Sequence, residues 1–168
     1  MVHLLRRSLQ VWSLVAAAWM LPCVAYADSA PFKEMREYLG DLRNGSQDRW
    51  FATLGQLAKS FDDVCGDTFC EGDYSDLSAL STYCAVSSGG IVAQCVWLFA
   101  GSYSNVSTKT GALGLKRKIF TCNLPLARGT TALALVDALA VSGNDDPIQR
   151  PLPGTTSSID DALVRCLH

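Results

Sequence analysis

The sequence predicts a disulfide-stapled α+β domain with an N-terminal helical hairpin, a three-stranded antiparallel meander and two C-terminal helices. Three observations support this fold class. Apolar residues recur at helical spacing before residue 62, whereas strand-like apolar runs fill the region 81–124. Glycine pairs and polar stretches separate these segments. The chain after a predicted export signal holds an even number of cysteines, which favours pairing.

Residues 1–27 have the features of a secretory signal peptide. Arg6 and Arg7 precede a nearly continuous apolar run, and Ala25-Tyr26-Ala27 matches a small-x-small cleavage motif. The apolar run is shorter than a membrane-spanning helix requires. We therefore expect a single domain at residues 28–168, located in the periplasm or outside the cell and without a stable membrane anchor.

The chain is mildly acidic. Its formal charge is −2, and the loss of Arg6 and Arg7 with the signal leaves 12 basic residues of 14 against 16 acidic residues, a charge of −4. Nucleic acids and anionic membranes attract basic patches. The net charge therefore argues against both as partners of the mature chain.

Six cysteines follow the predicted cleavage site: Cys65, Cys70, Cys84, Cys95, Cys122 and Cys166. In an exported chain an even number implies disulfide bonds, so we expect all six to be paired. The sequence leaves their connectivity open. No CxxC motif occurs, and His168 is the one histidine after the signal, so we expect neither a metal site nor a cofactor.

Two helices are expected before residue 62. The first would span 32–42, with Pro31 in its first turn and Asn44-Gly45 after its end. Its apolar residues have helical spacing: Phe32, Met35, Tyr38, Leu39 and Leu42. Ser46 would cap the second helix, whose buried stripe we expect to be Trp50, Phe51, Leu54, Leu57 and Phe61.

Three strands are expected at 81–86, 91–103 and 115–124. A two-residue turn at Gly89-Gly90 would place Cys84 opposite Cys95, where a cross-strand disulfide fits. The run 96–100 is apolar at every position, which favours a central strand covered on both faces. Residues 105–114 are small and polar and are expected to form a loop.

Basic residues begin the third expected strand at Lys116, Arg117 and Lys118. They would lie against the acidic residues between Asp62 and Asp76, or they would be solvated. An apolar helix at 129–141, with Asp137 as its lone charge, would pack on the sheet.

A proline-rich and glycine-rich loop at 142–156 would lead to the last helix. Ser158 would cap that helix, with Asp160 and Asp161 near its positive end. A bridge from Cys166 back to the sheet would then fix the C-terminus.

The segment from Asp62 to Asp76, DDVCGDTFCEGDYSD, contains no basic residue. Two interpretations remain open: a surface loop closed by Cys65 and Cys70, or a docking surface for a cation or for a basic partner. An EF-hand needs glycine at its sixth position, where Asp67 stands, so calcium binding of that type is not expected. The six carboxylates of this acidic segment are the candidate binding residues: Asp62, Asp63, Asp67, Glu71, Asp73 and Asp76.

The string CGDTFCEGDYSDL, from Cys65 to Leu77, resembles a motif of small exported bacterial proteins of unassigned function. The resemblance covers this motif and, more loosely, the cysteine-bearing strands after it. It implies no activity and no residue roles.

Few routes to catalysis are visible. Paired cysteines leave no thiolate, and neither GxSxG nor a glycine-rich phosphate loop occurs. Carboxylates are the remaining route, with Glu71 the best candidate and Glu34 and Glu37 more typical of a solvated face. We therefore expect a non-catalytic binding module, of the inhibitor or immunity type, whose acidic segment binds a protein with a basic surface. The alternatives are a carboxylate-dependent hydrolase of envelope polysaccharide and a structural secreted domain without a discrete site.

Overall fold

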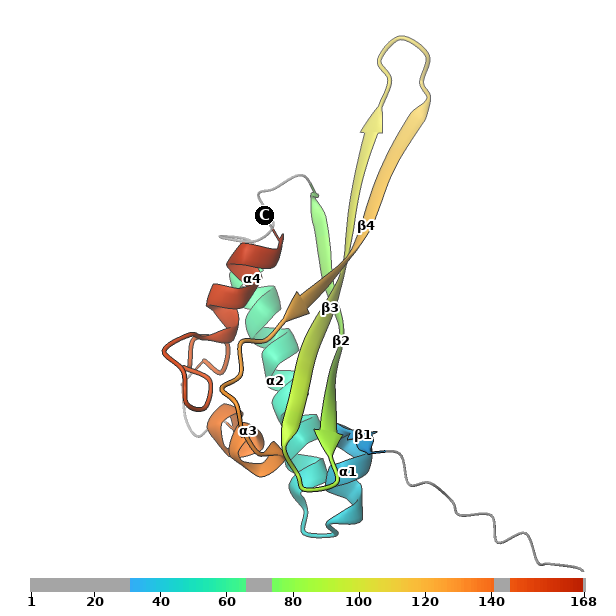
Figure 1. The fold of residues 1–168 in the computed structure, drawn as a ribbon. Coiled ribbons are helices and arrows are strands. Elements are labelled where there is room, and N and C mark those ends of the chain that lie inside the picture. The colour runs from blue at the N-terminus through green and yellow to red at the C-terminus, as the bar shows by residue number, and fades with distance from the viewer. Residues whose placement is uncertain (1–30, 66–73, 141–145, 168) are drawn as a thin grey trace, which may run out of the picture.

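The computed structural model describes residues 31–65, 74–140 and 146–167. Within these residues the chain forms one four-stranded antiparallel sheet and four helices, so the predicted α+β class is confirmed (Figure 1). The elements follow one another as β1 (Phe32–Glu34), α1 (Met35–Asp41), α2 (Ser46–Cys65), β2 (Asp76–Ser87), β3 (Val92–Val106), β4 (Leu113–Asn123), α3 (Ala132–Leu139) and α4 (Ile159–Leu167).

Strand β1 is a correction to the predicted three-stranded meander. The sheet order is β1-β2-β3-β4, and Phe32–Glu34 pair with residues 85–87 of β2 where the first helical turn was expected. Helix α1 begins after Glu34, whose carboxylate accepts a hydrogen bond from the Arg36 amide at 2.8 Å. The extended conformation depends on a partner strand distant in sequence, so local spacing did not predict it.

Helices α2, α3 and α4 lie on one side of the sheet (Figure 1). Side chains of β3 that are buried, Cys95, Trp97 and Phe99, point to this side. The centroid of the Phe61 ring of α2 lies 4.7 Å from the ring centroid of Phe99 and 6.0 Å from that of Trp97. This aromatic cluster joins α2 to the centre of the sheet.

The other side of the sheet, which we call the open face, carries none of α2, α3 and α4 (Figure 1). At its edge the Arg36 guanidinium of α1 lies 5.4 Å from the centroid of the Tyr83 ring. Val96, Leu98 and Ala100 alternate with the buried residues of β3 and are only half-buried. The prediction that the run 96–100 is covered on both faces was therefore wrong. A continuous apolar run cannot show whether a second layer exists.

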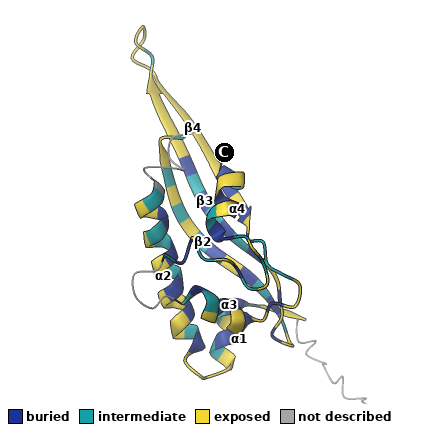
Figure 2. Cartoon of the chain, turned by 90° about the vertical axis from the view of Figure 1, so that its left-hand side faces the viewer, coloured by how far each residue is buried: buried dark blue, intermediate teal, exposed yellow. Residues whose placement is uncertain are grey.

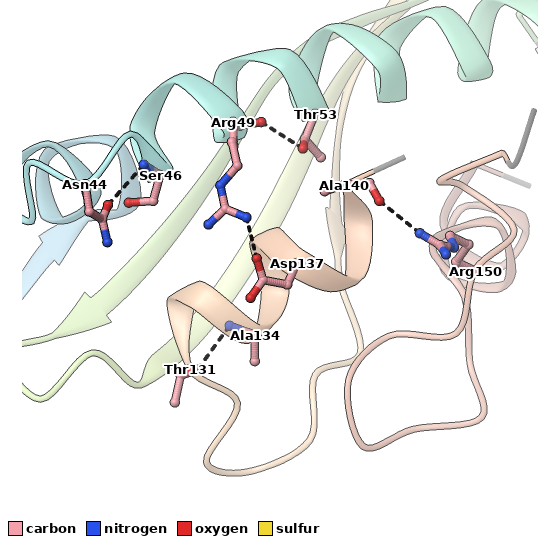
Figure 3. A network of polar contacts seen from close by, with 9 residues as sticks. All are labelled: Asn44, Ser46, Arg49, Thr53, Thr131, Ala134, Asp137, Ala140 and Arg150. Carbon is pink, nitrogen blue, oxygen red and sulfur yellow. Dashed lines mark hydrogen bonds and ion pairs between the residues drawn. The ribbon is translucent and has the colours of Figure 1, made fainter. Parts of the chain in front are cut away.

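The predicted stripe of α2 is confirmed for Trp50, Leu57 and Phe61, which are buried, whereas Phe51 is 48% exposed. Ser46 does not supply the expected cap. The side-chain oxygen of Asn44 accepts from the Ser46 amide at 3.0 Å (Figure 3), and the Ser46 hydroxyl is buried without a partner among the described residues.

Cys84 pairs with Cys95 across β2 and β3 and is bonded to it, as the sequence allowed. The turn differs from the predicted one. The Ser87 amide donates to the Ile91 carbonyl, which makes a three-residue loop with Gly90 at φ +79°. Val86 pairs with Val92 but Ala85 pairs with Gln94, so Ala93 is an extra residue that forms a β-bulge. The bulge offsets the longer turn and brings Cys84 opposite Cys95.

A second disulfide joins Cys122 of β4 to Cys166 of α4 and ties the last helix to the sheet as expected. Ser158 caps α4. Its hydroxyl accepts from the Asp161 amide at 3.1 Å, and the Asp161 carboxylate accepts from the Ser158 amide at 2.8 Å. The expected clasp of Cys65 and Cys70 lies outside what the structure describes.

Helix α3 is shorter than the predicted helix at 129–141, and it packs beside α2. Its buried residues, Ala132, Leu135, Val136 and Leu139, belong to the core, whereas its other face is exposed. Thr131 caps it, accepting from the Ala134 amide at 3.1 Å (Figure 3). Asp137 is exposed and forms a 2.5 Å ion pair with Arg49 of α2. After the undescribed part of the predicted loop, Arg150 donates to the Ala140 carbonyl at 3.0 Å.

Candidate functional site

Strands β3 and β4 continue far beyond the helices as a two-stranded arm, residues 102–119 (Figure 1). The pairing runs without interruption to Val106 and Leu113, so the predicted loop at 105–114 is only a turn from 107 to 112. That turn is closed by the Ser107 amide, which donates to the Ala112 carbonyl at 2.8 Å. Every residue of the arm is exposed except the half-buried Ser107 (Figure 2).

One face of the arm is apolar. Side chains alternate along each strand, and the buried residues of β3 mark its helix side. Val106, Leu115 and Ile119 therefore belong to the same side as the open face of the sheet. Their side chains, together with that of Leu113, are 61% to 75% exposed. An apolar stripe thus continues from the sheet along the arm, crossed at the base of the arm by Ser102 and Arg117, which pair with each other.

The opposite face of the arm is basic. Tyr103 pairs with Lys116, and Gly101 pairs with Lys118, on the helix side of the ladder. The Lys118 amine lies 4.2 Å from the centroid of the Phe120 ring, a cation–π contact. Lys116 has no ion-pair partner among the described residues. We call Tyr103, Lys116 and Lys118 the basic face.

The charge of the arm could have been read from the sequence. No aspartate or glutamate occurs between Asp76 and Asp137, while this stretch carries Lys109, Lys116, Arg117, Lys118 and Arg128. The net charge of the chain conceals this separation, because the acids lie on either side. The argument from net charge against anionic partners therefore does not hold for the arm.

The base of the arm is closely packed by two aromatic rings. The Tyr74 ring lies edge-on to the Phe120 ring, with centroids 5.5 Å apart. Both rings cover Gly101, where an added Cβ would come within 3.0 Å of each. Tyr74 directly follows the undescribed part of the acidic segment, so the end of that segment is fixed beside the arm.

The structure does not bring the described carboxylates of the acidic segment together. Asp62 and Asp63 are exposed in the last turns of α2, and Asp63 forms an ion pair with Lys59 at 2.8 Å. Asp76 begins β2 and accepts from the Ser75 and Ser102 hydroxyls at 3.3 Å. Both ends of the expected loop are therefore regular structure. Three predicted binding residues lie outside the described residues: Asp67, Glu71 and Asp73.

Comparison with protein-family models, curated proteins and solved structures finds no match for this chain. In the described ranges no group of His, Cys, Asp and Glu side chains is arranged to hold a metal ion. Across the same ranges no helix is both long and apolar enough to cross a membrane.

The remaining candidate carboxylates are engaged in local contacts. Glu34 caps α1 and pairs with the Arg36 guanidinium at 3.0 Å. Glu37 lies 3.5 Å from the Lys33 amine on the surface of α1. Glu37 is therefore on a solvated face, as the sequence favoured. Glu34 is not, because it ends β1 and one of its carboxylate oxygens is buried without a hydrogen-bond partner among the described residues. The candidate site of the described chain is therefore the arm.

Proposed function

We propose that this protein is an exported, non-catalytic binding module that holds its partner with the β3–β4 arm. The arm carries the proposal, because it extends beyond the helices and exposes a basic face that the described chain does not cover. A ribbon that serves only the stability of its own domain has no reason to project in this way. The Cys84–Cys95 and Cys122–Cys166 disulfides are compatible with export.

The shape of the arm favours a concave partner. Binding sites for other molecules are commonly clefts, and a convex two-stranded ribbon matches one. The basic face would meet acidic groups in that cleft, which accelerates association and fixes orientation. Tyr103 adds a rigid, amphipathic contact of the kind that is enriched in interfaces. The partner class that fits is an exported protein with an acidic cleft, and blocking that cleft would make this chain an inhibitor.

A second mode rests on the acidic segment. Asp62 and Asp76 are exposed, and neither has an ion-pair partner among the residues described. This supports the hypothesis of a basic partner protein for the segment. A hydrolase that uses Glu71 has no comparable observation in its favour.

The test compares two charge-reversal variants in a pull-down from the exported fraction of the native organism. Lys116→Glu with Lys118→Glu changes the basic face. Arg43→Glu with Arg128→Glu changes the net charge equally at exposed positions outside the arm. We expect the wild type and the second variant to retain the same protein and the first variant to lose it. Stopped-flow association at two salt concentrations should then show a slower, less salt-dependent on-rate for the first variant alone.

Equal retention by both variants would overturn the proposal. Duplex DNA and anionic vesicles are tested in parallel, because a basic two-stranded ribbon also suits the major groove and an anionic bilayer surface. Binding of either one, lost with Lys116→Glu and Lys118→Glu, in place of a protein would also contradict the proposal. It would assign the basic face to that other class of partner.

A further inference from the structure

The apolar stripe on the open side of the molecule is the feature that the proposed function leaves unused. It begins on the sheet at Val96 and Leu98 and continues on the arm through Ile119 and Leu115. Leu115 is 75% exposed and Leu113 is 72% exposed. Soluble chains rarely leave several large apolar side chains exposed on one face without a partner.

The arm itself needs support from a second layer. An isolated two-stranded ribbon is only marginally stable in water, because each strand lacks a second neighbour and the apolar side chains stay solvated. The Tyr74 and Phe120 rings stabilise the base of the arm, but no described element reaches Val106 or Leu113. A layer that covers the apolar face would provide what the arm lacks.

The charges of the open face select the occupant. Asp76 on β2 and Arg117 on β4 are both paired with Ser102 of β3, so the three residues form one row across the sheet. Consider a second copy placed face to face by a two-fold axis parallel to β3. The rotation exchanges β2 and β4 across the interface, so Asp76 of each copy faces Arg117 of the other.

A second row has the same complementarity. Tyr83 and Asn123 both pair with Val96, on opposite sides of β3. The Arg36 guanidinium lies 5.4 Å from the centroid of the Tyr83 ring, and the side-chain oxygen of Asn123 accepts from Gln94 at 2.7 Å. The same rotation places each Tyr83 hydroxyl opposite Asn123 of the other copy, whose side-chain nitrogen can donate to it. The two arms then lie with their apolar faces together, while Lys116 and Lys118 point outward on both sides.

We infer that the open face and the apolar face of the arm are the interface of a two-fold symmetric dimer of this chain. The interface is isologous, since the same patch contributes from each copy. It leaves the basic face free, so the dimer presents two basic faces outward. The inference does not depend on the proposed function, because the two use opposite faces of the arm.

An anionic lipid surface is the competing occupant of the apolar stripe. Leu113 and Leu115 would enter its interfacial layer readily. That arrangement would, however, press the Asp76 carboxylate against like charge and would make no use of the Asp76–Arg117 row. The reciprocal charges therefore favour the second copy.

Sedimentation equilibrium of the mature protein over a range of concentrations tests the dimer. We expect a dimer for the wild type, and we expect Asp76→Arg and Arg117→Asp each to raise the dissociation constant about tenfold or more. Each single variant sets like charges against each other twice. Near-ultraviolet circular dichroism checks that the variants are folded. Lys116→Glu, on the opposite face of the arm, is the control and should leave the molar mass from sedimentation unchanged.

Mixing the two single variants provides the decisive experiment. In a heterodimer of Asp76→Arg with Arg117→Asp, both contacts again join opposite charges, so the mixture should recover the dimer that each variant loses alone. A monomeric wild type, or single variants that dimerise as well as the wild type, would overturn the inference. A monomer whose binding to anionic vesicles is lost in Leu115→Glu would also overturn it, in favour of a lipid surface.

Discussion

The hydroxyl of Tyr38 lies against Gly90, so closely that a Cβ atom on Gly90 would come within 2.5 Å of it. Gly90 also has a φ of +79°, which residues with a side chain rarely adopt. Its carbonyl accepts from the Ala132 amide at 2.9 Å, at the start of α3. One turn residue therefore joins α1, the β2–β3 hairpin and α3.

Gly90→Ala should destabilise the fold. The substitution adds backbone strain and forces the Tyr38 side chain to move, so we expect the free energy of unfolding to fall by about 1–3 kcal/mol. Gly89→Ala is the matched control, because its nearest neighbour outside the chain-adjacent residues is the Ser87 hydroxyl at 3.9 Å. Urea denaturation monitored by fluorescence measures both. Equal urea midpoints for the two variants would contradict this prediction and would show that the Tyr38 side chain moves without loss of stability.

The two described disulfides should contribute unequally to stability. Cys122–Cys166 closes a sequence separation of 44 residues, and Cys84–Cys95 closes one of 11. If bridges act by restricting the unfolded chain, the longer loop should contribute about 1 kcal/mol more. Paired replacement of each bridge by alanine, compared in urea without reductant, measures the difference. A greater loss for the shorter loop would mean that strain or native contacts dominate instead.

The cap of α4 predicts an acid-dependent contribution. Hydrogen bonds from the Ser158 amide and hydroxyl, helped by Arg165, lower the pKa of Asp161 from its ordinary value of 3.8. A carboxyl group with a lowered folded pKa stabilises the fold above its unfolded pKa, and the contribution is lost as pH falls through the folded value. Wild type should therefore be more stable than Asp161→Ala at neutral pH. This difference in stability should begin to decrease as the pH falls to about 4.

Thermal unfolding of both proteins from neutral pH down to pH 2 checks the titration. Asp160→Ala is the control, because Asp160 lies in the same turn but does not bond to Ser158. A gap between wild type and Asp161→Ala that stays constant across this range would show that the charge of Asp161 plays no part.

Local signals in the sequence predicted the elements that local physics determines. The Ser158 cap and the buried residues Trp50, Leu57 and Phe61 of α2 follow from residue types at fixed spacing. The sequence also allowed the pairing of Cys84 with Cys95, although it did not predict the turn and the bulge that produce it. The longer turn and the bulge each shift the strand register by one residue in opposite directions, and no local sequence pattern predicts this compensation.

Features set by distant pairing were missed. β1 is extended because it lies against β2, and the arm exists because β3 and β4 continue to pair through small and polar residues with weak strand preference. The open face was missed because Val96 and Leu98 are as apolar as covered residues. In contrast, the basic arm was readable from the absence of acids between Asp76 and Asp137, had charge been counted by segment.

The last prediction concerns the acidic segment as a second docking surface. It is motivated by six carboxylates between Asp62 and Asp76 with no basic residue among them. If the segment meets a basic partner, Glu71→Gln with Asp73→Asn should slow association and flatten its salt dependence, because both changes remove charge while preserving shape. Asp137→Asn with Asp48→Asn removes equal charge at exposed positions elsewhere and should leave the on-rate unchanged.

A hydrolase would respond differently. Glu71→Gln alone should then abolish polysaccharide hydrolysis and leave partner binding intact, because an amide cannot act as a general acid or base. Stopped-flow association at two salt concentrations, measured beside a hydrolysis assay of the wild type, separates the two cases. If association is unchanged and the wild type hydrolyses nothing, the segment is a surface loop. Recognition would then fall to the arm, whose charge reversals at Lys116 and Lys118 test it independently of the segment.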